Sequence, residues 1–295
     1  MNIIDNAPMS KYTSFRCGGR AKKLVICDSV SELEQVMNEI AESKEEYLFL
    51  GNGSNTLFLD GIYDGTVVTL GKGFDDVEII DDGDEVRLKC MAAGLLSKIA
   101  KKALEESLSG FEFASGIPGS IGGAVFMNAG AYGGEIVDVL ESVELLSPNA
   151  DGKWELKTVP ADNLGLSYRH SRLQETKEIV VSATLRFPRG NKAEIEDRLA
   201  ELTKKRTSKQ PLEFPSAGSF FKRPEGYFAA KLIEDAGLKG VSVGGAQVSS
   251  KHCGFVINTG NATTDDIVDL MHLVQNTVFD KFGVKLEPEV RIIGL

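Results

Sequence analysis

The chain has 295 residues, of which 42% are hydrophobic and 26% charged, a balance typical of a globular protein with a buried core. Its formal net charge is −10, with 33 Lys and Arg against 43 Asp and Glu, so the composition predicts no nucleic-acid partner. An anionic ligand would need a local group of cations. No apolar run approaches the ~18 residues that span a bilayer, and no basic segment precedes an apolar one at the N-terminus, so we expect neither a membrane partner nor a signal peptide.

The four cysteines, Cys17, Cys27, Cys90 and Cys253, show no C-x-x-C spacing, and only three histidines accompany them. This pattern does not match the ligand spacing of a zinc site, so we expect no metal. Isolated thiols are typical of a reducing compartment, which predicts a cytoplasmic protein.

The first third of the chain predicts a helix and several strands. Residues 31–44 place apolar side chains at helical spacing, with Ser29 or Ser31 as the cap. Residues 46–50 predict a short buried strand that runs into the loop GNGSN (51–55). The later patterns predict strands at 65–70, 77–81 and 86–92, followed by a helix at 95–107.

The rest of the chain changes from strand-rich to mixed near residues 190–210, where we place a domain boundary. Before it lie a glycine-rich stretch (115–134), a hairpin over 139–159 turned at 149–152, and a strand at 178–187. After it, helices are expected at 192–210, at 228–240 with Gly237 near its end, and from Thr263 onward. Thr263 and Asp266 form a capping box for the last helix, whose core face is Ile267, Leu270, Met271 and Val274.

The first glycine loop, in GNGSNTLFLDG (51–61), follows a strand as a dinucleotide fingerprint would, but it fails as one. Thr56 stands where the third glycine belongs, and a strand follows instead of a helix. The main-chain N–H groups of a tight glycine turn can still hold a phosphate, and Ser54 and Asn55 would add donors. A plain hairpin loop remains the alternative.

The second glycine loop is apolar, which distinguishes it from a flexible linker. It contains Gly116, Gly119, Gly122, Gly123, Gly130, Gly133 and Gly134. Because glycine costs conformational entropy in regular structure, this density needs a reason. Main chain packed against a flat ligand and its diphosphate is one reason, and a close crossing of two backbone segments is the alternative.

Seven motifs in order now give a specific resemblance: TSFRCGG (13–19), GNGSN (51–55), SGIPGSIGGAVFMNAGAYG (115–133), YRHS (168–171), AGSFFKRP (217–224), GGAQVSSKHCGFVIN (244–258) and LEPEVRIIG (286–294). Together they resemble the UDP-N-acetylenolpyruvoylglucosamine reductases, flavoenzymes of bacterial peptidoglycan precursor synthesis. The short link after YRHS resembles the family's second structural type, which lacks a substrate-covering loop. A tyrosine that the first type uses in that loop therefore has no counterpart here.

The resemblance implies an α+β chain with an FAD-binding fold of the vanillyl-alcohol-oxidase type in two subdomains, and a C-terminal α+β substrate domain. We place these at 1–70, 71–200 and 201–295, with the last strand either staying there or returning to the FAD domain. The expected FAD-binding residues come from the two glycine loops: Gly51, Asn52, Gly53, Ser54, Asn55, Gly116, Ile117, Pro118, Gly119, Ile121, Gly122 and Asn128.

FAD should be bound noncovalently. Relatives in the wider superfamily often tether it through a histidine or a cysteine. The three histidines, His170, His252 and His272, lie outside both loops, and so do Cys17 and Cys90.

The implied reaction has two stages. NADPH reduces the flavin, which then delivers hydride to the vinyl carbon of an enolpyruvyl ether on UDP-N-acetylglucosamine, giving UDP-N-acetylmuramate. The neighbouring carbon becomes a carbanion and must take a proton. Ser219 has no base beside it in AGSFF, so it does not fit a hydrolase nucleophile. It matches the family's proton donor, a general acid.

Two more catalytic residues follow from the resemblance. Arg169 in YRHS matches the arginine that stabilises the substrate carboxylate, and Glu289 in EPEVR matches the catalytic glutamate. Without the family match, Ser219 reads as a surface turn, Arg169 as an ion-pair partner and Glu289 as a solvated edge-strand residue. Expected substrate contacts are Lys209, Arg223, Gln247 and Lys251.

Three other functions stay open on the residues alone: a different FAD-dependent oxidoreductase of the same fold, a non-catalytic nucleotide-binding module, and a structural protein. The pairing of Arg169, Ser219 and Glu289 would lack a purpose in the first two, and the third leaves the glycine loops unexplained. We expect a monomer.

Overall fold

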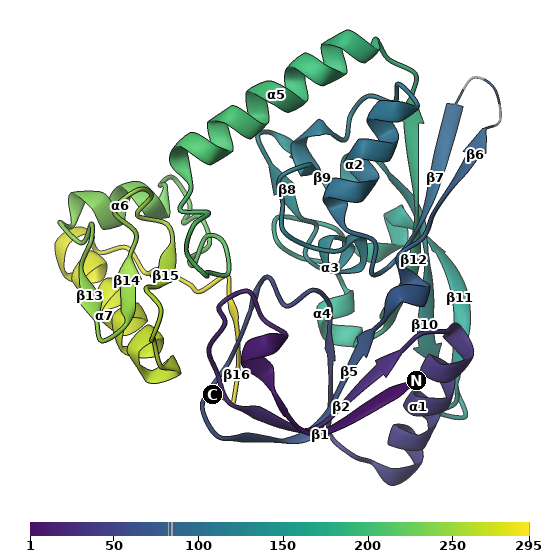
Figure 1. The fold of residues 1–295 in the computed structure, drawn as a ribbon, viewed down its shortest axis with the longest axis horizontal. Helices are drawn as coiled ribbons and strands as arrows, with labels where there is room; N and C mark the ends of the chain where they lie inside the picture. Colours follow the sequence, from purple (N-terminus) through teal and green to yellow (C-terminus); the bar gives the residue numbers. More distant parts are fainter. Residues whose placement is uncertain (82, 84, 295) are drawn as a thin grey trace. The chain divides into compact units, whose positions relative to one another are not determined.

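The computed structural model describes residues 1–81, 83 and 85–294, which divide into two compact units (Figure 1). The first unit comprises Met1–Ile4, Leu24–Asn52 and Gly65–Lys205. The second unit comprises Asp5–Lys23, Gly53–Asp64 and Arg206–Leu295. The chain passes between the units within β1 (Asn2–Pro8), β2 (Arg20–Cys27), β5 (Ile62–Leu70) and α5 (Lys192–Lys209), and at the first glycine loop.

The centre of the first unit is an antiparallel five-stranded sheet of order β11-β10-β12-β7-β6. Its strands are β6 (Val77–Asp81), β7 (Glu85–Met91), β10 (Leu140–Pro148), β11 (Trp154–Pro160) and β12 (Ile179–Pro188). The predicted β10–β11 hairpin is confirmed. Asn149 closes its turn, because its main-chain N–H donates to Lys153 O at 2.7 Å and its side-chain oxygen accepts from Asp151 N and Lys153 N at 3.0 Å.

The first unit also contains helices, short turns and part of a second sheet. A four-stranded sheet of order β1-β2-β5-β3 contains β3 (Tyr47–Leu50) parallel to β5. The α-helices are α1 (Val30–Ser43), α2 (Leu96–Glu105), α3 (Ile121–Phe126) and α4 (Leu173–Thr176), and β8 (Gly130–Ala131) pairs with β9 (Gly134–Glu135). Short 3₁₀ turns are η2 (Lys72–Phe74), η3 (Glu112–Ala114), η4 (Ile136–Asp138) and η5 (Ala161–Leu164).

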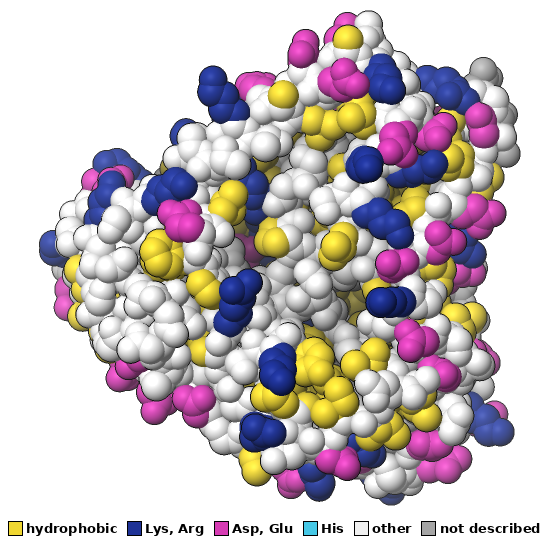
Figure 2. Space-filling model, in the orientation of Figure 1, with side chains coloured by type: hydrophobic (Ala, Val, Ile, Leu, Met, Phe, Trp, Pro, Cys, Tyr) yellow, Lys and Arg dark blue, Asp and Glu magenta, His cyan; other side chains and the backbone are white. Residues whose placement is uncertain are grey.

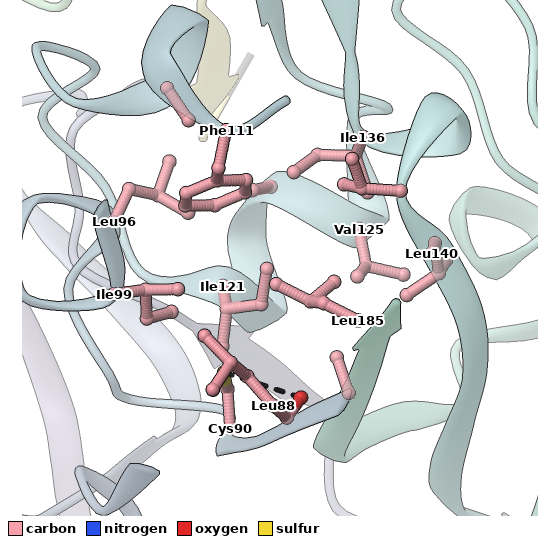
Figure 3. Close-up of a cluster of buried hydrophobic side chains, with 14 of the residues drawn as sticks. Leu88, Cys90, Leu96, Ile99, Phe111, Ile121, Val125, Ile136, Leu140 and Leu185 are labelled. Carbon is pink, nitrogen blue, oxygen red and sulfur yellow. Dashed lines mark hydrogen bonds between the residues drawn. The ribbon is translucent and has the colours of Figure 1, made fainter. Parts of the chain in front are cut away.

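The main core of the first unit lies where α2 and α3 cover the five-stranded sheet. In Figure 3, Ile121 and Val125 of α3 gather with Leu185 of β12 and Ile99 of α2, and Phe111 lies above them. Along β7 the buried side chains alternate with partly exposed ones, as expected for a strand with one covered face. Each fully buried leucine stabilises the fold by about 1.5–3 kcal/mol. This packing fixes α3 and the glycine loop that contains it.

The second unit combines small sheets with two packed helices. β4 (Thr56–Phe58) pairs in parallel with β16 (Arg291–Ile293), and β13 (Ser242–Val243), β14 (Ala246–Val248) and β15 (Val256–Asn258) form an antiparallel sheet. The helices are α6 (Ala229–Asp235) and α7 (Thr264–Phe282), and η1 (Met9–Lys11) is a 3₁₀ turn. Gly237, just after α6, has a φ of +81°.

The predicted start and core face of α7 are confirmed. Thr263 Oγ1 accepts from Asp266 N, the Asp266 carboxylate accepts from Thr263 N, and the side chains of Ile267, Leu270, Met271 and Val274 are buried. Asp266 also accepts from Gly245 N at 3.0 Å, and the N–H groups of Gly245 and Thr263 hold the pKa of its carboxyl below the usual range. Asp266 thus ties the GGAQ loop to the first turn of α7.

Local sequence signals set the first helix correctly. α1 begins after Ser29, whose Oγ accepts from Glu32 N at 3.2 Å, so Ser29 rather than Ser31 is the cap. The predicted strands and the helices at 95–107 and 192–210 are present, with ends shifted by a few residues.

The three-way domain division stays a prediction. The structure groups residues 5–23 and 53–64 with the C-terminal segment, and β16 pairs with β4 there.

The four cysteine thiols are free and buried. Burial raises the pKa of Cys17 and of Cys90 to about 12, and that of Cys27 to about 11. They are therefore protonated at neutral pH, which makes them poor nucleophiles for a covalent tether.

The described residues contain neither a metal-binding cluster nor a membrane-spanning helix. Over residues 1–81, 83 and 85–294, no group of three or more His, Cys, Asp or Glu side chains is arranged to hold a metal ion. Within the same residues, every helix is too short or too polar to cross a bilayer. On the face drawn in Figure 2, Lys and Arg side chains are interspersed with Asp and Glu.

Candidate active site

The two glycine loops approach each other within the first unit. A Cβ atom added to Gly51 would lie 3.5 Å from Ser120 Oγ and 4.0 Å from the Cα of Gly123. Gly51 is exposed, so the main chain at this meeting point is uncovered, and Asn52 and Gly116, one in each loop, are exposed as well. Uncovered main chain on two adjoining glycine loops fits the close approach that a dinucleotide diphosphate requires.

The glycines of the second loop divide into two groups. A Cβ on Gly122 would lie 3.0 Å from the Cβ of Ala92, and one on Gly134 would lie 2.6 Å from Phe113 Cδ1, so both are close-packed crossings. Gly123 has only Ser120 Oγ nearby, at 3.7 Å, and Gly133 has open space. A close crossing therefore explains Gly122 and Gly134, and contact with a flat ligand stays a prediction for the open glycines, Gly123 and Gly133.

The same loop contains a helix that the sequence did not predict. α3 begins at Ile121 and runs through Gly122 and Gly123. Glycine disfavours helices in isolation, but burial of Ile121 and Val125 in the core and the close contact at Gly122 override that preference.

The C-terminal half of the first loop belongs to the second unit, where it holds the segment of Glu289. Gly53 has a φ of +63°, and a Cβ there would lie 2.0 Å from Tyr12 O, so no other residue fits. Asn55 Nδ2 donates to Glu289 O at 3.0 Å, and Asn55 O accepts from Arg291 N at 3.0 Å. Asn55, predicted to bind the cofactor, thus also fixes the main chain on either side of Val290.

Ser219 and Glu289 lie on paired segments of the second unit. Glu289 N donates to Phe220 O at 2.8 Å, and Lys222 N donates to Glu287 O at 2.9 Å. Ser219 is exposed, whereas Phe220 and Phe221 beside it are 1% and 4% exposed. The two buried rings anchor the segment, and the serine hydroxyl is left at the surface next to the glutamate segment.

Arg169 is in the first unit, on a turn that a non-glycine residue does not readily adopt. Its φ is +55°, in the left-handed region, which costs roughly 1–2 kcal/mol for an L-residue with a side chain. Its Nη2 donates to Gly130 O at 3.2 Å, and its guanidinium lies 5.3 Å from the ring centroid of Tyr168. The arginine is therefore attached to the second glycine loop.

Asn128 forms a second link between that loop and the arginine turn. Its side chain is fully buried; Nδ2 donates to Glu135 Oε2 at 2.9 Å and to Ser167 O at 3.1 Å, and Oδ1 accepts from Val137 N at 3.0 Å. The sequence predicted Asn128 as an FAD-binding residue. In the structure its amide nitrogen donates to Glu135 and to Ser167, so the contacts of Asn128 support the turn that contains Arg169.

The four predicted substrate contacts are all in the second unit. Lys209 is exposed at the end of α5, and the Arg223 guanidinium lies 4.7 Å from the ring centroid of Phe228. Lys251 Nζ is 3.6 Å from a Glu213 carboxylate oxygen. Gln247 Nε2 donates to Ser242 Oγ at 3.0 Å and to Gly240 O at 3.3 Å.

Comparison with known families and proteins shows what this chain resembles. A family model described as FAD binding domain matches residues 21–155, and one described as UDP-N-acetylenolpyruvoylglucosamine reductase, C-terminal domain, matches residues 210–293. A reductase of that name from Agathobacter rectalis is 51% identical, over 100% of this chain and 95% of its own length. One from Clostridium botulinum (strain Eklund 17B) is 50% identical, over 98% of this chain and 92% of its own length.

Solved structures give the same result. The UDP-N-acetylenolpyruvylglucosamine reductase of Thermus caldophilus superposes with a TM-score of 0.82 at 34% identity, covering 99% of this chain and 98% of that one. A solvent-stable cholesterol oxidase matches with a TM-score of 0.50 at 14% identity, over 64% of this chain and 38% of its own. That second likeness shows a shared fold alone.

The relationship confirms several predictions. The chain is an α+β protein with an FAD-binding fold of the vanillyl-alcohol-oxidase type, it uses FAD and NADPH, and it is an oxidoreductase of peptidoglycan synthesis. The match extends over the whole chain at about half identity. This chain therefore belongs to the UDP-N-acetylenolpyruvoylglucosamine reductase family.

Proposed function

We propose that this chain reduces the enolpyruvyl ether of UDP-N-acetylglucosamine to the lactyl ether with Ser219, Arg169 and Glu289 as its catalytic residues. The observation that carries this proposal is the pairing in the second unit: an exposed serine hydroxyl next to the glutamate segment, both held by buried phenylalanines. The family membership supplies the substrate class.

The residues that would hold FAD are the uncovered main chain of Gly51 and Asn52 and the Gly116–Gly119 segment, with Ile121 and Gly122 behind it. Gly53, Ser54 and Asn55, the rest of the first glycine loop, complete the predicted set of FAD-binding residues in that loop. Bound FAD supplies the hydride that adds to the vinyl carbon of the substrate.

Ser219 supplies the proton. As hydride adds to the vinyl carbon, the double-bond electrons move to the carbon beside the carboxylate, and this carbanion takes the hydroxyl proton of Ser219. A carbanion is basic enough to deprotonate a hydroxyl, so Ser219 needs no partner base, unlike a nucleophilic serine. The serine oxygen then regains a proton from water, which its exposed position in the second unit allows.

Arg169 binds the substrate carboxylate, which becomes an enediolate as charge develops. A guanidinium offers two parallel N–H groups, the geometry that both carboxylate oxygens need. Its attachment to Gly130 O and to the Tyr168 ring limits the positions the guanidinium can take. A donor fixed before the reaction stabilises the transition state at no reorganisation cost.

Glu289 either donates a hydrogen bond in its neutral form or orients the intermediate. A second carboxyl beside the substrate carboxylate favours protonation, because like charges repel. Lys209 and Arg223 bind the diphosphate and the sugar nucleotide, and Gln247 and Lys251 add contacts nearby. We expect the enzyme to act as a cytoplasmic monomer on UDP-N-acetyl-enolpyruvylglucosamine.

The direct test of the activity is NADPH consumption. We expect absorbance at 340 nm to fall rapidly only when the enolpyruvyl sugar nucleotide is present, under anaerobic conditions and with catalytic protein. NADPH consumption that is independent of that substrate would favour a different FAD-dependent oxidoreductase.

FAD should come off the protein on acid precipitation. The purified protein is expected to be yellow, and trichloroacetic acid should leave the yellow colour in the supernatant, because the cysteine thiols are buried and protonated and no histidine lies in either loop. Absorbance of supernatant and pellet at 450 nm measures this. Flavin that stays with the pellet would contradict noncovalent binding.

A further inference from the structure

Arg169 occupies the third position of a four-residue turn. Ser167 N donates to His170 O and His170 N donates to Ser167 O, both at 3.1 Å, which closes the turn. A left-handed φ at this position normally favours glycine or asparagine. Such a conformation persists in a larger residue only where the surroundings hold it.

Gln174, in the short helix α4, is one residue that holds it. Its Nε2 donates to Arg169 O at 3.0 Å and to Phe126 O at 3.2 Å. Both partners are carbonyl oxygens, so only the amide nitrogen of Gln174 can satisfy them. Phe126 is the last residue of α3, where helix carbonyls have no partner inside the helix.

Ser171 makes a contact that allows a comparison. Its Oγ donates to the same Phe126 O at 2.7 Å. Ser171 therefore shares with Gln174 the task of closing the end of α3. Gln174 in addition joins that helix end to the residue whose side chain we place on the substrate carboxylate.

We propose that Gln174 is a positioning residue for the reaction, which fixes the left-handed main chain of Arg169 relative to the second glycine loop. This inference rests on the proposed catalytic role of Arg169. Because reacting groups must be held to within a fraction of an ångström, loss of this link should slow chemistry while leaving the fold intact.

The test is a double-mutant cycle read out on the two half-reactions. Gln174→Met keeps the length of the side chain and removes both hydrogen bonds. We expect reoxidation of the reduced protein by the enolpyruvyl substrate to slow by about 10–100-fold, the range for a slightly misplaced group, with reduction by NADPH unchanged. In an Arg169→Lys background, Gln174→Met should cause no further slowing, because the effect passes through Arg169.

Ser171→Ala is the matched control. It removes one hydrogen bond to the carbonyl of Phe126 and is expected to lower the melting temperature. Its effect on the reoxidation rate should be small and should add to the effect of Arg169→Lys. Gln174→Glu is the second variant, to be used if Gln174→Met does not fold. A glutamate side chain has the same shape as glutamine, but its ionised carboxylate cannot donate a hydrogen bond. This variant is expected to show the same pattern.

The possible failures are distinguishable. If Arg169→Lys turns over normally at saturation, the proposed role of Arg169 is itself wrong. If Arg169→Lys is slow but Gln174→Met is not, or if Gln174→Met slows the Arg169→Lys protein as much as it slows the parent, the positioning role alone is overturned.

Discussion

Ser219→Ala is expected to reduce its flavin with NADPH at nearly the normal rate and to reoxidise it with substrate far more slowly. The first half-reaction needs no proton on carbon, whereas the second does. General acid catalysis contributes about 10²–10⁴-fold, and a loss near the upper end is expected, because no other donor lies on the AGSFF segment. Anaerobic stopped-flow absorbance at 450 nm separates the two rates.

A serine in the same segment provides the control. Ser216 lies three residues before Ser219. The variant Ser216→Ala should leave the rates of both half-reactions close to normal. The buried rings of Phe220 and Phe221 should keep the segment in place in both variants, so circular dichroism and the melting temperature should not change. Equal slowing of both half-reactions in Ser219→Ala would mean that this residue serves the fold or the cofactor.

Arg169→Lys is expected to lose activity although the charge is retained. A lysine ammonium is a point charge without the planar fork, so it cannot hold both oxygens of the developing enediolate. Loss of one preorganised donor typically costs about 10²–10³-fold in turnover. The loss should appear in reoxidation by substrate, and substrate affinity should fall less, because in our proposal Lys209 and Arg223 would still bind the diphosphate and the sugar nucleotide.

Two measurements separate chemistry from binding for this variant. Titration of substrate into the oxidised protein, followed by the flavin spectrum, gives affinity, and single-turnover reoxidation gives the rate of chemistry. Arg172→Lys, whose parent side chain pairs with Glu178 at 3.0 Å, controls for an arginine-to-lysine change elsewhere in the same stretch. Normal turnover of Arg169→Lys at saturation would make Arg169 a binding residue only.

Local signals in the sequence were enough for most elements. The caps of α1 and α7 involve residues three positions apart, and the hairpin turn at Asn149 to Gly152 is closed by its own side chain. These contacts depend on neighbours in the chain, so a pattern of residue types predicts them. The helix α3 could not be predicted in this way, because its formation depends on contacts with Ala92 and with the sheet core, which are distant in the chain.

The candidate site required both kinds of information. Ser219, Arg169 and Glu289 were predicted only through the ordered motifs of the family, since each has an ordinary explanation alone. Their surroundings depend on contacts between distant residues: Glu289 pairs with Phe220, and Asn55 donates to Glu289. The supports of Arg169 were not foreseen, because neither Asn128 nor Gln174 sits within the YRHS motif.

The sequence also did not predict which segments of the chain make up each of the two units. Residues 5–23 and 53–64 pack with the C-terminal segment, although all of residues 65–205 separate them from it in the chain. Gly53 makes the reason concrete, because its missing Cβ lets the loop lie against Tyr12. No local pattern marks which distant segment such a glycine will meet.

The most direct test of the account is the identity of the product. Protein, NADPH and UDP-N-acetyl-enolpyruvylglucosamine should be incubated without oxygen, and the sugar nucleotide should be recovered for mass spectrometry. We predict that it gains two hydrogen atoms, with one NADPH consumed for each molecule formed. Recovery of unchanged sugar nucleotide, whether or not NADPH is consumed, would contradict the proposed reaction.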